Sequence, residues 1–250
     1  MKLLENGAIE ENYRTSFTHC GINGVLTNKS YLLLMENIAG IHSNYFHFTF
    51  SDLAKDNLTW VILNWKLKVI KRLGPDQNIR IQTWGRFFNR VFVIRDFKIY
   101  DEQNDLCAVA SSKWCLVNFK TGKIAPMPKN IDQIYGKFNP ESVFNIEDLP
   151  RIIIPNNNPI SNDTYKIRRF DLDNNKHVHN LNYINFAYEV LPEDVFLGYE
   201  YNNLEIIFKK EIRYGETINS FIHNNENNNG YTIEIKSLDE KVTHSIVKLY

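Results

Sequence analysis

Residues 31–41 read YLLLMENIAGI, an apolar run that stands before a long series of short β-like segments. Thr27, Asn28 and Ser30 precede the run, and residues of these types cap the N-termini of helices. Because the run is apolar on nearly every side, it predicts a buried helix rather than a surface helix.

The segments that follow this helix are rich in β-branched and aromatic residues, and several alternate apolar with polar positions. Turn residues such as Gly74, Pro75 and Asp76 separate them. A helix followed by successive antiparallel strands is an α+β arrangement. The predicted strands are Leu63–Ile70, Ile79–Trp84, Arg90–Tyr100 and Cys107–Phe119.

The same pattern restarts after a proline-rich stretch, Met127–Pro159, for which we predict one short strand at Arg151–Ile154. Asn182–Leu191 predicts a second buried helix. The polar run Asn224–Gly230 is typical of a hairpin loop. The strands expected after the second helix are Leu204–Tyr214, Thr217–His223, Tyr231–Ile235 and Val242–Leu249.

The two halves indicate a duplication, because both run from a polar loop to a helix and then to strands. Individual positions also match, at one offset around the helix, which pairs Asn23 with Asn175 and Tyr31 with Tyr183, and at a second offset after it, which pairs Gly74 with Gly215. We therefore expect an N-terminal domain over residues 1–130, a connection over 131–160 and a C-terminal domain over 161–250.

The composition excludes several classes of protein. Lys plus Arg equals Asp plus Glu at 29 each, whereas a nucleic-acid-binding protein usually has a basic excess. Cys20, Cys107 and Cys115 have no spacing that predicts a disulfide framework or a zinc site. No stretch predicts a signal peptide or a membrane span, so we expect a cytoplasmic protein, and the composition favours a bacterial one.

Polar residues gather directly before the second helix, in residues 171–180, which read DLDNNKHVHN. Such a loop offers acids, imidazoles and backbone N–H groups, among them those of Val178–Asn180, for base catalysis and oxyanion binding. The alternative is that Asp and Asn here only form turns and caps. Two His residues without a third ligand make a metal site a poor interpretation.

The spacing Asp173-x-Asn175-x-His177 resembles the active-site motif of the acyl-acyl carrier protein (acyl-ACP) thioesterases, with His179 in place of the first of the two Asn residues that end the family motif. The family also has a Glu on the strand after the helix, and Glu211 stands at that spacing. The resemblance continues in the first half, for example in residues 83–86 and 93–101, and spans nearly the whole chain.

This resemblance implies a tandem (double) hotdog, in which each half wraps an antiparallel sheet around a long central helix. It implies hydrolysis of a fatty acyl-ACP thioester, with Asp173, Asn175, His177 and Glu211 as catalytic residues and with no cofactor or metal. Plant members often have Cys after the Glu, and Ile212 stands there in this chain, so a Cys mechanism is not expected.

The first half has no acid, imidazole or carboxylate at the matching positions, which are Gly21, Val25 and Ile70. We therefore expect the N-terminal domain to bind the acyl chain and the C-terminal domain to be catalytic. The expected partner is acyl carrier protein, an acidic protein with a phosphopantetheine arm, met by a local basic rim. The alternative functions are an acyl-coenzyme A thioesterase and a non-catalytic acyl-binding module. For the oligomeric state, the alternatives are a monomer and a homodimer. The rim residues are Arg168, Arg169, Lys176, Lys209, Lys210 and Arg213.

Overall fold

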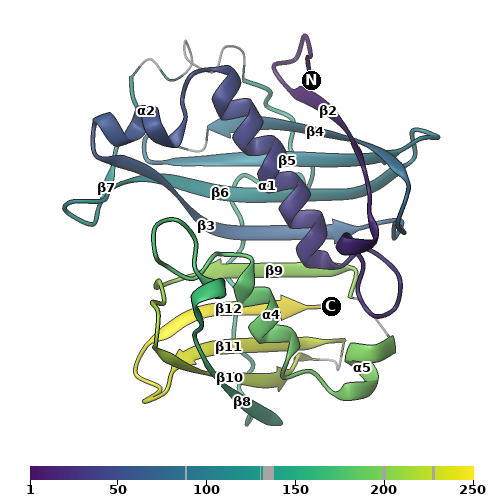
Figure 1. Ribbon diagram of the computed structural model, residues 1–250, viewed down its shortest axis with the longest axis vertical. Helices are drawn as coiled ribbons and strands as arrows, with labels where there is room; N and C mark the ends of the chain where they lie inside the picture. The colour runs from purple at the N-terminus through teal and green to yellow at the C-terminus, as the bar shows by residue number, and fades with distance from the viewer. Residues whose placement is uncertain (88, 130, 132–137, 199–200, 227–228) are drawn as a thin grey trace. The chain divides into compact units, whose positions relative to one another are not determined.

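The computed structural model describes residues 1–87, 89–129, 131, 138–198, 201–226 and 229–250. It divides into two compact units, Met1–Leu149 and Pro150–Tyr250, and the boundary between their residue ranges falls inside the predicted connection. Each unit has an antiparallel sheet with helices against it, as Figure 1 shows, and this confirms the α+β prediction.

In the first unit the sheet has the order β1-β2-β4-β5-β6-β3, with β7 beside β6, and all neighbours are antiparallel. The long helix α1 lies across this sheet (Figure 1). The elements are β1 (Lys2–Leu3), β2 (Ile9–Arg14), α1 (Asn28–Tyr45), α2 (Phe50–Lys55), β3 (Leu58–Val69), β4 (Asn78–Phe87), β5 (Phe92–Asp101), β6 (Leu106–Asn118) and β7 (Lys123–Ala125).

Helix α1 begins where the sequence predicts. The Thr27 side chain is the N-cap, and its Oγ1 accepts a hydrogen bond of 3.1 Å from the Ser30 backbone N–H. Tyr31, Leu32 and Met35 are completely buried on this helix. The apolar run therefore forms the central helix because the sheet covers it.

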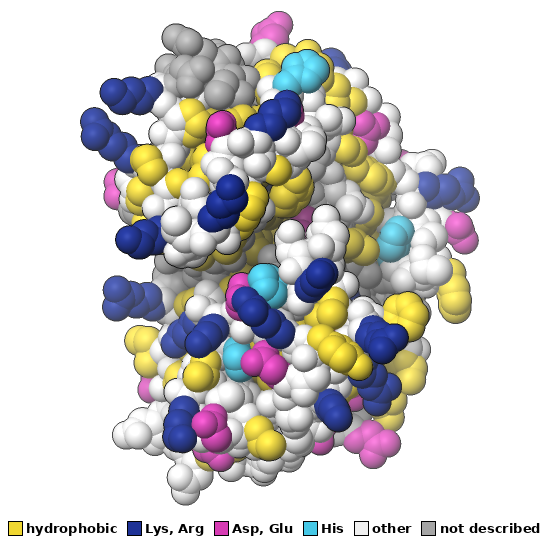
Figure 2. Space-filling view, turned by 60° about the vertical axis from the view of Figure 1, so that its left-hand side comes forward, with side chains coloured by type: hydrophobic (Ala, Val, Ile, Leu, Met, Phe, Trp, Pro, Cys, Tyr) yellow, Lys and Arg dark blue, Asp and Glu magenta, His cyan; other side chains and the backbone are white. Residues whose placement is uncertain are grey.

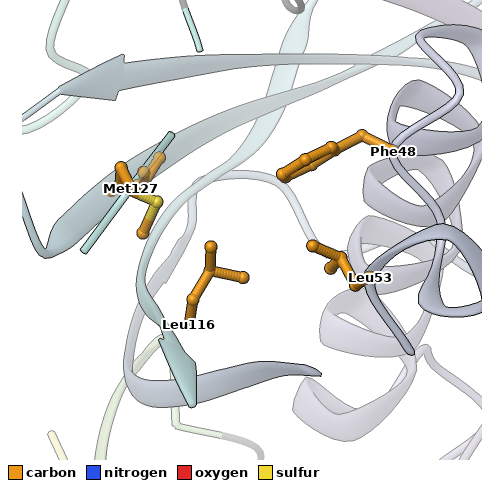
Figure 3. Packing of buried hydrophobic residues seen from close by; sticks show 5 residues of the cluster. Phe48, Leu53, Leu116 and Met127 are labelled. Carbon is orange, nitrogen blue, oxygen red and sulfur yellow. The ribbon is translucent and has the colours of Figure 1, made fainter. Parts of the chain in front are cut away.

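A cluster of apolar side chains joins the end of α1 and α2 to the sheet. Figure 3 shows Phe48 and Leu53 on one side and Leu116 of β6 and Met127 on the other, and Val93 of β5 completes the cluster. All five side chains are buried. This packing fixes the short helix α2, which the sequence analysis did not predict.

The chain after β7 is bound to the first unit over residues 138–149. The indole N–H of Trp84 donates to the Glu141 carbonyl oxygen at 2.9 Å, and Lys113 Nζ lies 2.6 Å from Asp148 Oδ2. The first unit therefore runs to Leu149. The strand predicted at Arg151–Ile154 is wrong, because no strand forms there. Prolines stand on both sides of this segment and lack the N–H that a ladder needs.

In the second unit the sheet has the order β9-β12-β11-β10-β8, and α4 packs on β10, β11 and β12 (Figure 1). The second helix is shorter than predicted, because Leu191 precedes Pro192 and a residue before proline avoids helical geometry. The elements are β8 (Ser161–Lys166), α4 (Asn182–Tyr188), α5 (Glu193–Gly198), β9 (Asn203–Phe208), β10 (Thr217–Asn224), β11 (Tyr231–Ser237) and β12 (Thr243–Leu249).

The strand predicted over Leu204–Tyr214 is wrong in its second half, since β9 ends at Phe208. The N–H groups of Lys209 and Lys210 both donate to the His244 carbonyl oxygen, at 2.8 and 3.2 Å. The chain thereby leaves the ladder. Glu211 consequently lies beyond the strand. Among the described residues, no helix is both long and apolar enough to cross a membrane.

Candidate active site

The loop that carries the predicted motif is closed by the Asp173 carboxylate. Its Oδ1 accepts hydrogen bonds from the N–H groups of Asn175 and His177, at 2.8 and 3.2 Å. The Asp173 N–H in turn donates to the His177 carbonyl oxygen at 2.8 Å. Asp173 therefore forms the turn, as one interpretation of the sequence predicts. In the part of the chain that the structure describes, Oδ1 alone of the two carboxylate oxygens is engaged.

His177 and Glu211 lie side by side, although they are far apart in the sequence. Nε2 of His177 is 3.4 Å from Oε1 of Glu211, and Arg213 Nη2 donates to the same oxygen at 2.8 Å. The side chains of His177 and Glu211 are 31% and 48% exposed, so a substrate has access to both. An imidazole beside a carboxylate is an arrangement that moves protons.

Helix α4 holds the backbone around Glu211 through the buried hydroxyl of Tyr183. This hydroxyl donates to the Lys210 carbonyl oxygen at 3.4 Å and accepts from the Ile212 N–H. Burial raises the pKa of the Tyr183 hydroxyl above its usual value, so it stays a neutral donor. The two peptide groups on either side of Glu211 are thus fixed by one side chain.

Two backbone amides expected to bind an oxyanion are occupied. The Val178 N–H donates to the Ile212 carbonyl oxygen and the His179 N–H donates to the Asp171 carbonyl oxygen, both at 2.9 Å. These bonds tie the loop to the Glu211 segment and to the preceding turn. Neither amide is therefore free to bind a substrate oxygen. Asn175 is exposed, and its side-chain amide can act as a neutral donor.

The cysteines are poor nucleophiles. Burial raises the pKa of the Cys107 and Cys115 thiols to about 11 and raises the pKa of Cys20. All three therefore stay protonated near neutral pH, and only a thiolate is an effective nucleophile. Among the described residues, no group of three or more His, Cys, Asp and Glu side chains is placed to hold a metal ion.

The first unit repeats this loop without its chemistry. The Leu26 N–H donates to the Leu73 carbonyl oxygen at 2.9 Å, and the Leu73 N–H donates to the Tyr31 hydroxyl at 2.8 Å. Leu73 therefore corresponds to Ile212, and Arg72 corresponds to Glu211. The match of Ile70 with Glu211, made from the sequence, is wrong by two positions, because β3 ends at Val69 and β9 at Phe208, so that Arg72, not Ile70, lies as far beyond its strand as Glu211 does.

Comparisons with known proteins identify the family of the chain. A family model described as the acyl-ACP thioesterase N-terminal domain matches residues 7–135, and one described as the C-terminal domain matches residues 156–248. The chain belongs to the acyl-ACP thioesterase family. The resemblance seen in the sequence is thereby confirmed.

Curated acyl-ACP thioesterases resemble the chain over most of its length. An oleoyl-acyl carrier protein thioesterase from Coriandrum sativum is 24% identical over 240 residues, or 87% of this chain. A second, from Arabidopsis thaliana, is 23% identical over 88% of the chain. The chain spans only 63% and 64% of the length of these two relatives.

Solved acyl-ACP thioesterases share the fold. One from Bacteroides thetaiotaomicron has a TM-score of 0.84, 23% identity and coverage of 98% of both chains. The 12:0-ACP thioesterase from Umbellularia californica has a TM-score of 0.85, 15% identity and coverage of 98% of this chain and 97% of its own. These matches confirm the predicted double hotdog.

Proposed function

We propose that the chain hydrolyses the thioester of fatty acyl-ACP, releasing a free fatty acid and holo-acyl carrier protein. The observation that carries this proposal is the contact between His177 and Glu211, held beside the loop that Asp173 closes. Family membership supports the substrate class, since the curated relatives carry acyl-ACP thioesterase names.

The C-terminal unit would perform the chemistry. The corresponding loop of the first unit has Gly21 for Asp173, Val25 for His177 and Arg72 for Glu211. A loop without acid and imidazole does not activate water. The remaining role for the N-terminal unit is to bind the acyl chain, which suits its long, largely apolar helix α1.

Hydrolysis requires an attack on the thioester carbonyl carbon and cleavage of the carbon–sulfur bond. The Glu211 carboxylate would accept the proton of the attacking water, and His177 would return a proton to the leaving sulfur. The Asn175 amide would donate to the carbonyl oxygen as negative charge develops on it. In the other route, the Oδ2 of Asp173 attacks directly and water then cleaves the anhydride.

Single turnover in heavy-oxygen water distinguishes these routes. Water attack puts the label into the fatty acid alone, whereas attack by Asp173, with water then adding to the Asp173 carbonyl carbon of the anhydride, puts the label into the Asp173 carboxyl and leaves the fatty acid unlabelled. Mass spectrometry of the peptide that contains residues 171–180 measures this. Labelling of Asp173 would overturn the water route.

The activity itself is tested by free-thiol release from acyl-ACPs of different chain lengths, with matching acyl-coenzyme A esters alongside. Turnover that prefers the carrier protein supports the proposal. Turnover only on coenzyme A esters would replace it with an acyl-coenzyme A thioesterase. Tight acyl binding without turnover would indicate a binding module.

A further inference from the structure

The turn before the active-site loop exposes an aromatic side chain completely. Phe170 lies in the 3-10 helix Arg169–Asp171, and its relative exposure is 101%. A fully exposed Phe gains none of the free energy that burial of its ring would give. Single exposed apolar residues are common, so its meaning depends on its surroundings.

The turn that carries Phe170 is held rigidly by Asp171. Asp171 Oδ2 accepts from the Arg168 N–H at 2.7 Å and from the Tyr165 hydroxyl at 3.0 Å, and the Asn182 side chain donates to the Asp171 carbonyl oxygen at 3.0 Å. Phe170 is therefore presented in a fixed position. A preorganised anchor loses little entropy when it is buried by a partner.

Arginines placed over aromatic rings flank Phe170. The Arg168 guanidinium lies 5.6 Å from the centroid of the Tyr165 ring, and that of Arg169 lies 5.8 Å from the centroid of Tyr214, which is 56% exposed. We call Arg168, Arg169, Phe170 and Tyr214 the Phe170 surface. Figure 2 shows that Lys and Arg side chains lie beside hydrophobic ones on the face that carries exposed His side chains.

The Phe170 surface is continuous with the active site. Tyr214 follows Arg213 in the chain, and Arg213 donates to Glu211, which contacts His177. A partner that covers Phe170 and Tyr214 is therefore beside the reacting groups. Its own charge must be negative to match the arginines.

We infer that the Phe170 surface is the docking site for the acyl carrier protein. Phe170 is the apolar anchor, and Arg168 and Arg169 meet carboxylates of the acidic partner. The inference rests on the proposed function. It identifies Arg168 and Arg169 as the part of the expected basic rim that binds the carrier protein. It also adds Phe170, an aromatic residue that the charge pattern did not reveal.

The test compares Phe170→Ser with Phe17→Ser. Phe17 is 82% exposed on the corresponding 3-10 helix, Phe17–His19, of the first unit, but it has no arginine beside it in the sequence. Affinity for fluorescent carrier protein without an acyl group is measured by anisotropy. We expect Phe170→Ser to weaken binding about tenfold or more, as hot-spot truncations do, and Phe17→Ser to leave it within about twofold.

Turnover gives a second readout. Phe170→Ser is expected to raise KM for acyl-ACP while leaving kcat/KM for a short acyl-pantetheine ester unchanged. Equal carrier affinity of wild type and Phe170→Ser would overturn the inference. So would Phe170-dependent binding to anionic lipid vesicles, or Phe170-dependent dimerisation in sedimentation, without an effect on the carrier. Because binding is measured without catalysis, failure of the proposed activity stays distinguishable from failure of the docking site.

Discussion

Nε2 of His177 lies 3.4 Å from Oε1 of Glu211. The two residues belong to separate loops, and backbone hydrogen bonds between neighbouring residues link these loops. The Val178 N–H donates to the Ile212 carbonyl oxygen, and His177 forms an isolated bridge with Arg213. These main-chain bonds position the pair, and substitution of the His177 or Glu211 side chain leaves them in place.

Removing either member of this pair is expected to abolish most turnover. His177→Ala and Glu211→Gln should each lower kcat about a hundredfold or more, because each removes a proton-transfer group. Steady-state thiol release measures the loss, and circular dichroism verifies the fold. Glu147→Gln, an exposed carboxylate of the first unit, is the matched control and should keep wild-type kcat. Near-full activity of Glu211→Gln would contradict the assignment.

Substitution at Asp173 separates chemistry from loop formation. Asp173→Asn keeps an oxygen that accepts the N–H groups of Asn175 and His177, so unfolding free energy should change by less than about 0.5 kcal/mol. Its kcat should still fall about a hundredfold, because the charge is lost. Asp173→Ala should lose both activity and about 1 kcal/mol of stability. Urea unfolding and thiol release measure the two effects, and equal stability of both variants would disprove the loop role.

Tyr183→Phe should disturb the active site from inside α4. It removes the hydroxyl that bonds to the peptide groups on either side of Glu211, so we expect a loss of about 1–2 kcal/mol in stability and roughly a tenfold lower kcat. Tyr31→Phe is the matched control, because its hydroxyl has the corresponding bond in the first unit. It should cost similar stability with little change in kcat. Equal losses of kcat in both variants would contradict a positioning role for Tyr183.

Stability should fall in mild acid because of His42. Burial, with the nearby Arg95 charge, lowers the pKa of His42 to about 2, and Arg95 Nη1 lies 2.8 Å from His42 Nδ1 and donates to it. The unfolded chain binds this proton below about pH 6.5 and the folded chain does not. Stability is therefore retained above pH 6.5 and decreases as pH falls, by up to about 2 kcal/mol between pH 7 and pH 5.

Unfolding in urea at pH 7 and pH 5 measures this dependence. His42→Gln should show a shallower decrease than the wild type. His47→Asn, at an exposed position, should keep the wild-type decrease. Identical pH dependence of wild type and His42→Gln would exclude His42 as the source.

Gly230 is expected to tolerate no side chain. Its φ is +126°, and an added Cβ would overlap the carbonyl oxygen of Leu249. Gly230→Ala should therefore cost several kcal/mol of stability. Gly40→Ala is the comparison, because α1 leaves open space around Gly40, and it should stabilise by roughly 0.5–1 kcal/mol. Thermal unfolding distinguishes the two, and a neutral Gly230→Ala would contradict the overlap.

Hydrophobic patterning predicted the buried strands and helices of both units but not the polar strands near the ends of the sheets. The strands β3 to β6 and the helix α1 follow apolar runs and were predicted within a few residues. The strands β2 (IEENYR) and β8 (SNDTYK) are polar, and their pairing with β4 and β10 defines them. β8 is an edge strand, and β2 has beyond β4 only the two-residue strand β1, so both strands are open to solvent and carry no apolar signal.

The sequence by itself determined that Asp173, Asn175 and His177 share one loop before a helix, because all three lie within five positions. It also determined the duplication and the family. Only the tertiary structure brought Glu211 to His177, placed the Tyr183 hydroxyl across the Glu211 backbone and made Arg72 the counterpart of Glu211. The reason is physical: these relations depend on where β9 leaves its ladder and on which carbonyl oxygens the freed segment meets, and no local pattern records a long-range hydrogen bond.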